Sequence, residues 1–174
     1  MGKLKFIIAV AISFILLGCS NSGERQSAQN NGVLIYQNLV DIDYGNDICR
    51  YSGEIIKTVR YGGKITMSDG TVHKFMSTEC TAGFFHGIAD KSLIDKIEIV
   101  DFAHGQQFLP VKDLVFLRSS LRPSPNGLNL TAVDRSNEKM KTYIYDAYPG
   151  TYYSWEEVLE IVENEWNLNT TAMK

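Results

Sequence analysis

The chain has 174 residues, 44% of them hydrophobic, and a formal net charge of −3. This length fits one domain of ordinary size, with enough apolar residues to form a core. A mildly acidic chain without a cluster of basic residues lacks the electrostatic footprint of a nucleic-acid-binding protein, so we exclude that class.

The first eighteen residues have the features of a bacterial secretion signal. Two lysines precede an apolar run at residues 6–17, which is too short to span a bilayer comfortably as a permanent helix. The run ends at Gly18 and Cys19, a junction that resembles the bacterial lipobox and implies cleavage before Cys19 and acylation of its sulfur. We therefore expect a signal peptide at residues 1–18 and a lipid on Cys19. An ordinary secretory peptide with a coincidental cysteine is the alternative.

A polar stretch follows the lipidated cysteine. Residues 20–32 are Ser, Asn, Gln, Gly and charged residues, with Ala28 the only ordinary apolar residue among them. Such a composition cannot bury enough surface to order itself, so we expect residues 19–32 to be a flexible tether. Removal of the signal peptide takes away two lysines and no acid, and the net charge of the mature chain becomes −5.

The first part of the folded chain, which begins at the apolar run 33–36, has strong strand and turn signals. The run 55–61 is β-branched and aromatic, the Gly62-Gly63 pair is typical of a two-residue turn, and Asp69-Gly70 is a strong hairpin signal. These patterns predict a three-stranded antiparallel meander over residues 55–75.

A helix should follow the meander. Ser77 is the expected N-cap of a helix over residues 78–88. Cys80, Phe84 and Ile88 fall on one apolar face of that helix, so the Cys80 sulfur should point towards the core. A further alternating strand, ending near residue 102, completes the first group of elements.

The second part of the chain repeats the order of strands followed by a helix. A buried strand at 114–117 and an alternating strand at 128–132 flank a Pro- and Gly-rich loop at 122–127. Asp134 is the expected cap of a helix with one apolar face. That face consists of Met140, Tyr143, Ile144 and Ala147. A short strand at 151–153 then leads into a capping box that opens the last helix. The residues of the box are Ser154, Trp155, Glu156 and Glu157.

The order of elements predicts an α+β fold of two consecutive antiparallel strand-plus-helix units. We place the first unit at residues 33–108 and the second at residues 109–174. The repetition is one of architecture only, because the sequence has no repeat period.

Two cysteines remain once Cys19 is lipidated. Cys49 precedes the first predicted strand and Cys80 lies in the first turn of the following helix. The two could meet in space as a disulfide, form a soft-metal site, or be two unrelated core residues. In an oxidising compartment a disulfide is the more frequent state of such a pair, unless a metal or a reductant holds the thiols.

Five short segments resemble the NosL family, lipoproteins that handle Cu(I) during maturation of periplasmic nitrous oxide reductase. The segments are YGNDICRY at 44–51, DGTVHKF at 69–75, EC at 79–80, SPNG at 124–127 with LTA at 130–132, and YSWEEV at 153–158. They occur in the family's order and at compatible spacings from about residue 42 to residue 162, together with the lipobox. The resemblance implies a NosL-like fold, an accessory role in copper handling or nitrous oxide reductase maturation, Cu(I) as the metal, and periplasmic copper-maturation proteins as partners.

The sulfur-bearing positions of the family motifs are altered in this chain. NosL proteins usually carry Cys-x-x-Cys-x-Met where this chain keeps Cys49 but has Ser52 and Glu54, and Pro-Met-Gly where it has Asn126. Cu(I) is a soft ion that prefers thiolate and thioether ligands, so these replacements remove ligands and spare the frame. The resemblance therefore implies a copper site that has been lost or rebuilt.

The residues leave two hypotheses of different class. In the first, Cys49 and Cys80 still bind Cu(I), with Met67 or Met76 close by. In the second, the protein is a binding or scaffold lipoprotein of the envelope that holds no metal, and a Cys49–Cys80 disulfide closes the loop between them. Because Ser20 follows the lipidated cysteine in place of the aspartate associated with inner-membrane retention, we expect a periplasm-facing protein in the outer membrane.

Enzymatic activity is not predicted. The sequence has no nucleophile elbow, zinc-spaced histidine pair or phosphate loop, and Ser52 removes the Cys-x-x-Cys of a thiol oxidoreductase. Three histidines fall on a strand, on the polar face of a helix and in a turn, where surface or structural roles are the rule. They are His73, His86 and His104. Glu54 and Asp47, the remaining candidate pair, flank a strand and should simply be solvated.

Overall fold

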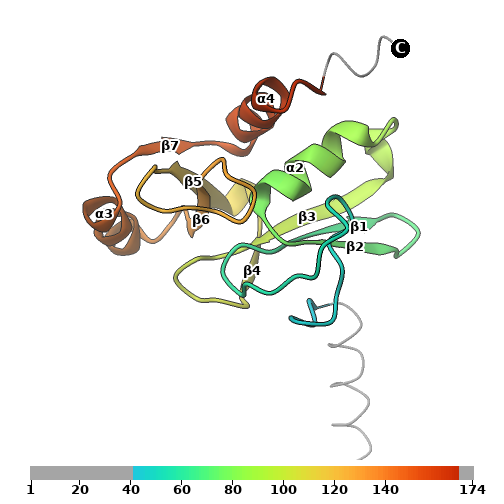
Figure 1. The fold of residues 1–174 in the computed structure, drawn as a ribbon, viewed down its shortest axis with the longest axis horizontal. Helices are drawn as coiled ribbons and strands as arrows, with labels where there is room; N and C mark the ends of the chain where they lie inside the picture. Colours follow the sequence, from blue (N-terminus) through green and yellow to red (C-terminus); the bar gives the residue numbers. More distant parts are fainter. Residues whose placement is uncertain (1–40, 169–174) are drawn as a thin grey trace, which may run out of the picture. The chain divides into compact units, whose positions relative to one another are not determined.

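Two antiparallel sheets and the helices that accompany them make up the fold in a computed structural model that describes residues 41–168 (Figure 1). These residues all lie in one compact unit of the chain, Gln37–Lys174. The predicted signal peptide, Cys19, the tether and the apolar run 33–36 lie outside the described residues. Among the helices that are described, none is long and apolar enough to cross a membrane.

The first sheet has four strands in the order β2-β1-β3-β4. The strands are β1 (Gly63–Met67), β2 (Val72–Phe75), β3 (Ile94–Val100) and β4 (Phe108–Pro110). All pairs are antiparallel. The hairpin predicted at Asp69-Gly70 is confirmed: Gly70 adopts a φ of +86°, which favours glycine, and its N–H bonds the Met67 carbonyl at 2.9 Å.

The first strand of the predicted meander is wrong. Residues 55–61 form no strand beyond an isolated bridge between Ile55 and Ile48. Gly63, predicted in a turn, is instead the first residue of β1, where an added Cβ would lie 2.2 Å from Thr81 Oγ1. Because Gly63 has no side chain, α2 can pack closely against the sheet at this point. The neighbour of β1 on the side opposite β2 is β3, instead of the strand expected at residues 55–61.

Helix α2 (Thr78–Gly87) follows β2 as predicted. Ser77 is its N-cap, with Oγ accepting the Cys80 N–H at 3.1 Å. A short 3₁₀ turn, η1 (Lys91–Leu93), then leads into β3. The cap and the apolar spacing thus place Cys80 in the first turn of the helix, on its buried face.

The second sheet has three strands in the order β6-β5-β7. They are β5 (Leu114–Arg118), preceded by the 3₁₀ turn η2 (Val111–Asp113), then β6 (Leu130–Asp134) and β7 (Thr151–Tyr153). Helix α4 (Trp155–Glu165) begins at the predicted capping box, since Ser154 Oγ accepts the Glu157 N–H and the Glu157 carboxylate accepts the Ser154 N–H. These observations confirm the predicted α+β class.

Helix α3 (Glu138–Ala147) differs in detail from the expectation. Its N-cap is Asn137, because the carboxylate of Asp134 is engaged by Ser136 in a local turn. On the predicted apolar face, Ile144 is buried but Tyr143 is 70% exposed. The helix therefore contacts the sheet with a narrower face than its sequence suggests.

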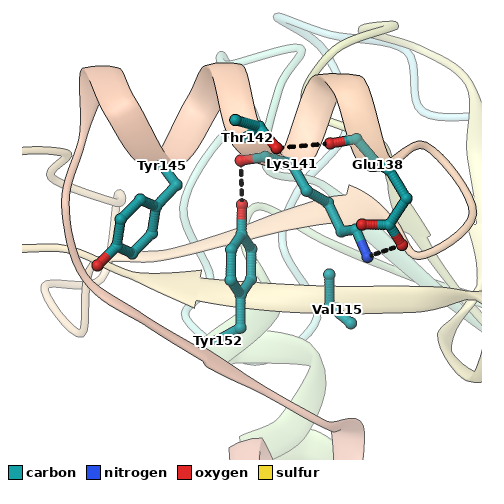
Figure 2. Close-up of a pocket in the computed structure, with 6 residues that line it drawn as sticks. All are labelled: Val115, Glu138, Lys141, Thr142, Tyr145 and Tyr152. Carbon is teal, nitrogen blue, oxygen red and sulfur yellow. Dashed lines mark hydrogen bonds and ion pairs between the residues drawn. The ribbon is translucent and has the colours of Figure 1, made fainter.

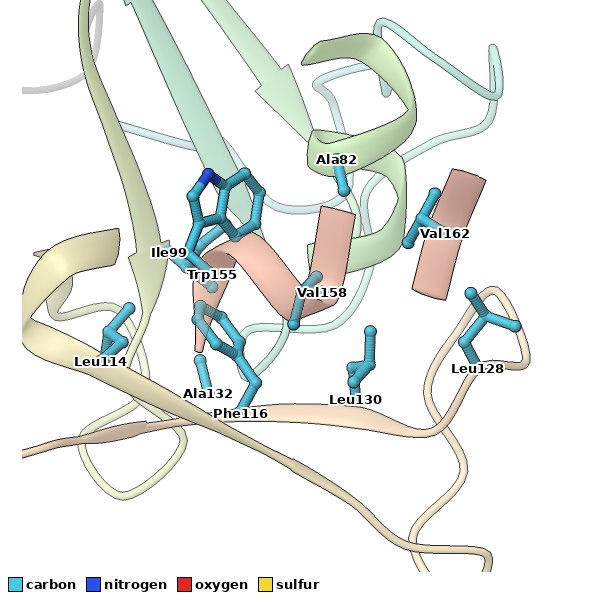
Figure 3. Packing of buried hydrophobic residues seen from close by; sticks show 10 residues of the cluster. All are labelled: Ala82, Ile99, Leu114, Phe116, Leu128, Leu130, Ala132, Trp155, Val158 and Val162. Atoms are coloured by element: carbon cyan, nitrogen blue, oxygen red, sulfur yellow. The ribbon is translucent and has the colours of Figure 1, made fainter. Parts of the chain in front are cut away.

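One apolar cluster joins both sheets to α2 and α4 (Figure 3). Its members are Ala82, Ile99, Leu114, Phe116, Leu128, Leu130, Ala132, Trp155, Val158 and Val162. Burial of each larger side chain of this kind stabilises the fold by about 1.5–3 kcal/mol. The predicted boundary at residues 108/109 falls within β4, and the division into two units stays a prediction.

Candidate metal centre

A tight hairpin carries Cys49 to the end of β2. The Cys49 N–H bonds the Glu54 carbonyl at 2.8 Å, and the Gly53 N–H bonds the Cys49 carbonyl at 2.9 Å. Gly53 has a φ of +76°, so glycine suits the sharp return of the chain. The Arg50 N–H bonds the carbonyl of Lys74 in β2 at 2.9 Å. This bond ties the hairpin to the strand that leads directly into α2.

The two predicted cysteines meet at this point. Cys49 and Cys80 are both free and both buried, with 1% and 0% of their surface exposed. The two sulfurs are neighbours, because each thiol perturbs the pKa of the other, although the residues belong to a hairpin and a helix. The structure thus supplies the second sulfur that a two-cysteine site requires. Cys80 lies beside Cys49 and is also part of the apolar core with Phe75.

The contact makes the two thiols electrostatically unequal. The pKa of Cys49 is lowered to about 5, chiefly by the Cys80 S–H and further by hydrogen bonds from Ser52 and the Met76 backbone, against the opposing effect of burial. The pKa of Cys80 is raised by the same contact, by burial and by the Cys49 charge. The pair therefore favours a thiolate on Cys49 and a protonated thiol on Cys80.

A thioether lies next to the pair. Ser52 Oγ lies 3.3 Å from Met76 Sδ and next to the Cys49 sulfur, and its single proton is donated to one or the other. Of the two methionines considered from the sequence, Met76 thus borders the cysteines. Met67 lies instead in β1 and lines a small cleft with Asp69 and other residues of the hairpin turn.

Asn126, which stands where the family motif Pro-Met-Gly has methionine, contacts Cys80. Asn126 Oδ1 accepts a hydrogen bond from Cys80 Sγ at 3.2 Å and another from Ser77 Oγ at 2.7 Å. The Cys80 S–H carries one proton, so it donates to either the amide oxygen or the Cys49 sulfur. Ser52 and Asn126 are therefore both brought to the cysteines, but with oxygen where the family motif has sulfur.

Glu54 is the altered position that does not contact the thiols in the structure. Its side chain is exposed and lines an open cleft of about 530 Å³ with Met76 at one wall. The other lining residues are Gly53, Ile55, Lys57 and Thr58. Asp47, the other carboxylate of the pair suggested by the sequence, forms an ion pair with Lys74, with Oδ2 2.7 Å from Nζ.

Glu79 is the residue of this site whose role the sequence left unassigned. Its side chain is fully buried, and burial raises the pKa of the carboxyl group. Oε1 accepts a short hydrogen bond from Ser124 Oγ and a longer one, at 3.4 Å, from the Leu130 N–H. Within the described chain Oε2 has no hydrogen-bond partner. In the sequence, the signal that could have identified Glu79 is its place next to a cysteine in the first turn of an apolar helix.

The three histidines have structural contacts and lie apart from the thiols. The His73 ring packs on Phe84 at 4.9 Å, His86 Nε2 contacts the Leu159 carbonyl at 3.0 Å, and His104 Nδ1 contacts Asp101 at 2.7 Å. A separate cleft of about 320 Å³ lies between α3 and the second sheet (Figure 2), and its lining includes Tyr145 and Tyr152 but no residue of the cysteine site.

The donor set at the cysteines suits a soft monovalent ion. Among residues 41–168 no group of three or more His, Cys, Asp or Glu side chains could hold a metal. Cu(I) does not require such a group, because two thiolates can hold it in a near-linear site and a thioether can assist. Cys49, Cys80 and Met76 supply these atoms, so the residues present fit Cu(I).

Comparisons with known proteins give a likeness of fold. No protein-family model matches the sequence, and no curated protein matches it. Among solved structures, the copper chaperone NosL from Shewanella denitrificans matches with a TM-score of 0.55 and 18% sequence identity, over 67% of this chain and 91% of that one. That neighbour is a chaperone rather than an enzyme. The match supports the predicted architecture, and the chain has a NosL-like fold.

Proposed function

We propose that this protein is a periplasm-facing lipoprotein, anchored through Cys19, that handles copper by binding Cu(I) between Cys49 and Cys80. The observation that carries this proposal is the contact between two buried, free thiols from separate segments. The likeness of fold to a copper chaperone supports the choice of metal. The role would be accessory to copper handling or to maturation of nitrous oxide reductase, from the outer membrane.

The site is a rebuilt and weaker form of the family's copper site. Ser52 and Asn126 contact the sulfur atoms but offer oxygen, which Cu(I) binds poorly. Glu54 offers a carboxylate at the surface. We therefore expect 1:1 Cu(I) binding that depends on both cysteines and is weaker than in a relative with the full sulfur motif.

A competition titration tests this function. The protein that begins at Ser20 is titrated with Cu(I) against a chromophoric chelator under reducing conditions. Cys49→Ser and Cys80→Ser should each abolish binding, whereas Met67→Leu, the matched control at a methionine outside the site, should bind as the wild type does. Absence of Cu(I) binding by the wild-type protein, or binding by either cysteine variant as tight as that of the wild type, would refute the proposal.

Restoration of the motif tests the weaker affinity. The triple variant Ser52→Cys, Glu54→Met and Asn126→Met puts sulfur back on a frame that already presents positions 52 and 126 to the thiols. Its Cu(I) affinity should exceed that of the wild type. Equal affinities would show that these positions do not contribute ligands.

The disulfide-linked scaffold is the alternative that the same contact favours under oxidising conditions. The structure has both cysteines free. Counting thiols in protein that is unfolded without reductant separates the two functions: two reactive thiols support the copper site, and none supports the scaffold.

A further inference from the structure

Both thiols of the site are buried, and one turn of the chain contacts the Cys80 sulfur. This turn, residues 124–127, places Asn126 Oδ1 3.2 Å from Cys80 Sγ. The Gly127 N–H closes the turn on the Ser124 carbonyl at 3.2 Å, and Gly127 adopts a φ of +84°. Because Cu(I) binds the thiolate, binding at Cys80 removes the S–H proton, and with it any S–H···O bond to the amide.

The turn is held from beneath by a buried side chain of α2. Ser124 Oγ donates to Glu79 Oε1 and accepts the Asn129 N–H at 2.9 Å, and the Leu130 N–H also donates to Oε1. Glu79 is fully buried and Ser124 nearly so. A buried hydrogen bond of this kind is costly to leave unmade. The turn that carries Asn126 is thus fixed to the same helix turn that carries Cys80.

We propose that Glu79 is a positioning residue that acts through Ser124 to hold the Asn126 amide over Cys80 as a cap, which Cu(I) displaces on binding. The inference rests on the proposed function of the cysteine pair. The cap contributes to the burial of Cys80, and it adds to the weakness of the site because part of the binding free energy is spent on opening it. Glu79 contacts no metal in this scheme.

The test uses substitutions that should lower the stability of the fold and at the same time raise its affinity for Cu(I). Ser124→Ala removes the donor to Glu79 and should lower the unfolding free energy while Cu(I) binding becomes about fivefold tighter, the value of one net hydrogen bond. A purely structural role for Ser124 would leave affinity unchanged or reduce it. Asn126→Ala removes the cap itself and should tighten binding similarly.

A double-variant cycle shows whether the effect of Ser124 passes through Asn126. In the Asn126→Ala background, Ser124→Ala should change Cu(I) affinity no further, although it still lowers stability. Glu79→Gln keeps an acceptor for Ser124 and Leu130 and should retain the affinity of the wild type.

The outcomes separate this inference from the proposed function. Additive effects of Ser124→Ala and Asn126→Ala, or weaker binding by either single variant, would overturn the cap, while wild-type binding would still stand. Weaker binding by Asn126→Ala would mean that the amide assists the thiolate rather than covers it. If the wild-type protein binds no Cu(I), both the function and the cap fail.

Discussion

Gly83 lies beneath an aromatic contact that joins the cysteine hairpin to the last helix. Tyr51, two residues after Cys49, stacks on Trp166 with ring centroids 5.3 Å apart. A Cβ at position 83 would lie 2.7 Å from Trp166 Cζ3 and 2.8 Å from Tyr51 Cζ. Carbon atoms prefer separations of about 3.5–4.0 Å, so the rings must move by roughly 1 Å.

Gly83→Ala should therefore destabilise the fold despite the better helix propensity of alanine. Alanine in a helix interior gains about 1 kcal/mol over glycine. Against this gain, overpacking costs about 1–3 kcal/mol, and loss of the stacked pair costs a further ~0.5–1.5 kcal/mol. The balance is a loss of about 0.5–3.5 kcal/mol, at the lower end if the rings swing outwards.

The matched control is Gly87→Ala in the same helix. No heavy atom lies within 4 Å of a Cβ built there, so this variant should be as stable as the wild type or gain up to about 1 kcal/mol. Urea unfolding followed by circular dichroism gives the two free energies, and tryptophan emission reports on Trp166 together with Trp155. Equal stability of the two variants, with unchanged emission from Gly83→Ala, would refute the packing argument.

Two further predictions concern the last helix and the buried carboxyl group. Ser154→Ala removes the oxygen that accepts the Glu157 N–H and should cost about 1 kcal/mol in urea unfolding, whereas Ser154→Thr should cost only a few tenths; equal losses would argue against the capping box. Burial raises the pKa of Glu79, so the folded chain keeps the carboxyl proton at pH values where the unfolded chain has lost it. The contribution of Glu79 to stability therefore falls as the pH rises from the ordinary pKa of a carboxyl group through the raised pKa of the folded state. Glu79→Gln should remove that slope and gain stability relative to the wild type towards neutral pH, and parallel pH profiles of the two proteins would contradict this.

Local signals in the sequence predicted the elements that begin or end at a capping or turn residue. Ser77, Asp69-Gly70 and the Ser154 capping box each satisfy particular backbone groups, and each occurs where expected. The run at 55–61 failed because β-branched and aromatic residues also suit an irregular segment whose side chains are buried one by one. Ile56 and Tyr61 are buried in this way, whereas Lys57 and Thr58 between them are exposed. Long-range packing of Gly63 on α2, which no local pattern encodes, determined where β1 begins.

The sequence identified most residues of the cysteine site, but it predicted their arrangement in space only in part. Cys49, Cys80 and the altered positions Ser52 and Asn126 were all identified beforehand, and the structure places these four together. The choice of Met76 over Met67 depends on the strand β2 ending beside the hairpin. The link from Glu79 to Ser124 spans 45 residues of sequence, and a hydrogen bond across that distance has no sequence signature.

The central claim, that Cys49 and Cys80 hold Cu(I) together, is tested most directly by X-ray absorption at the copper edge of the loaded protein. We expect a first shell made of two short sulfur contacts in the wild type, and the same spectrum in Met67→Leu, whereas Cys80→Ser should not retain this two-sulfur copper signal. A first shell of nitrogen or oxygen, or a spectrum that does not change in Cys80→Ser, would contradict the claim.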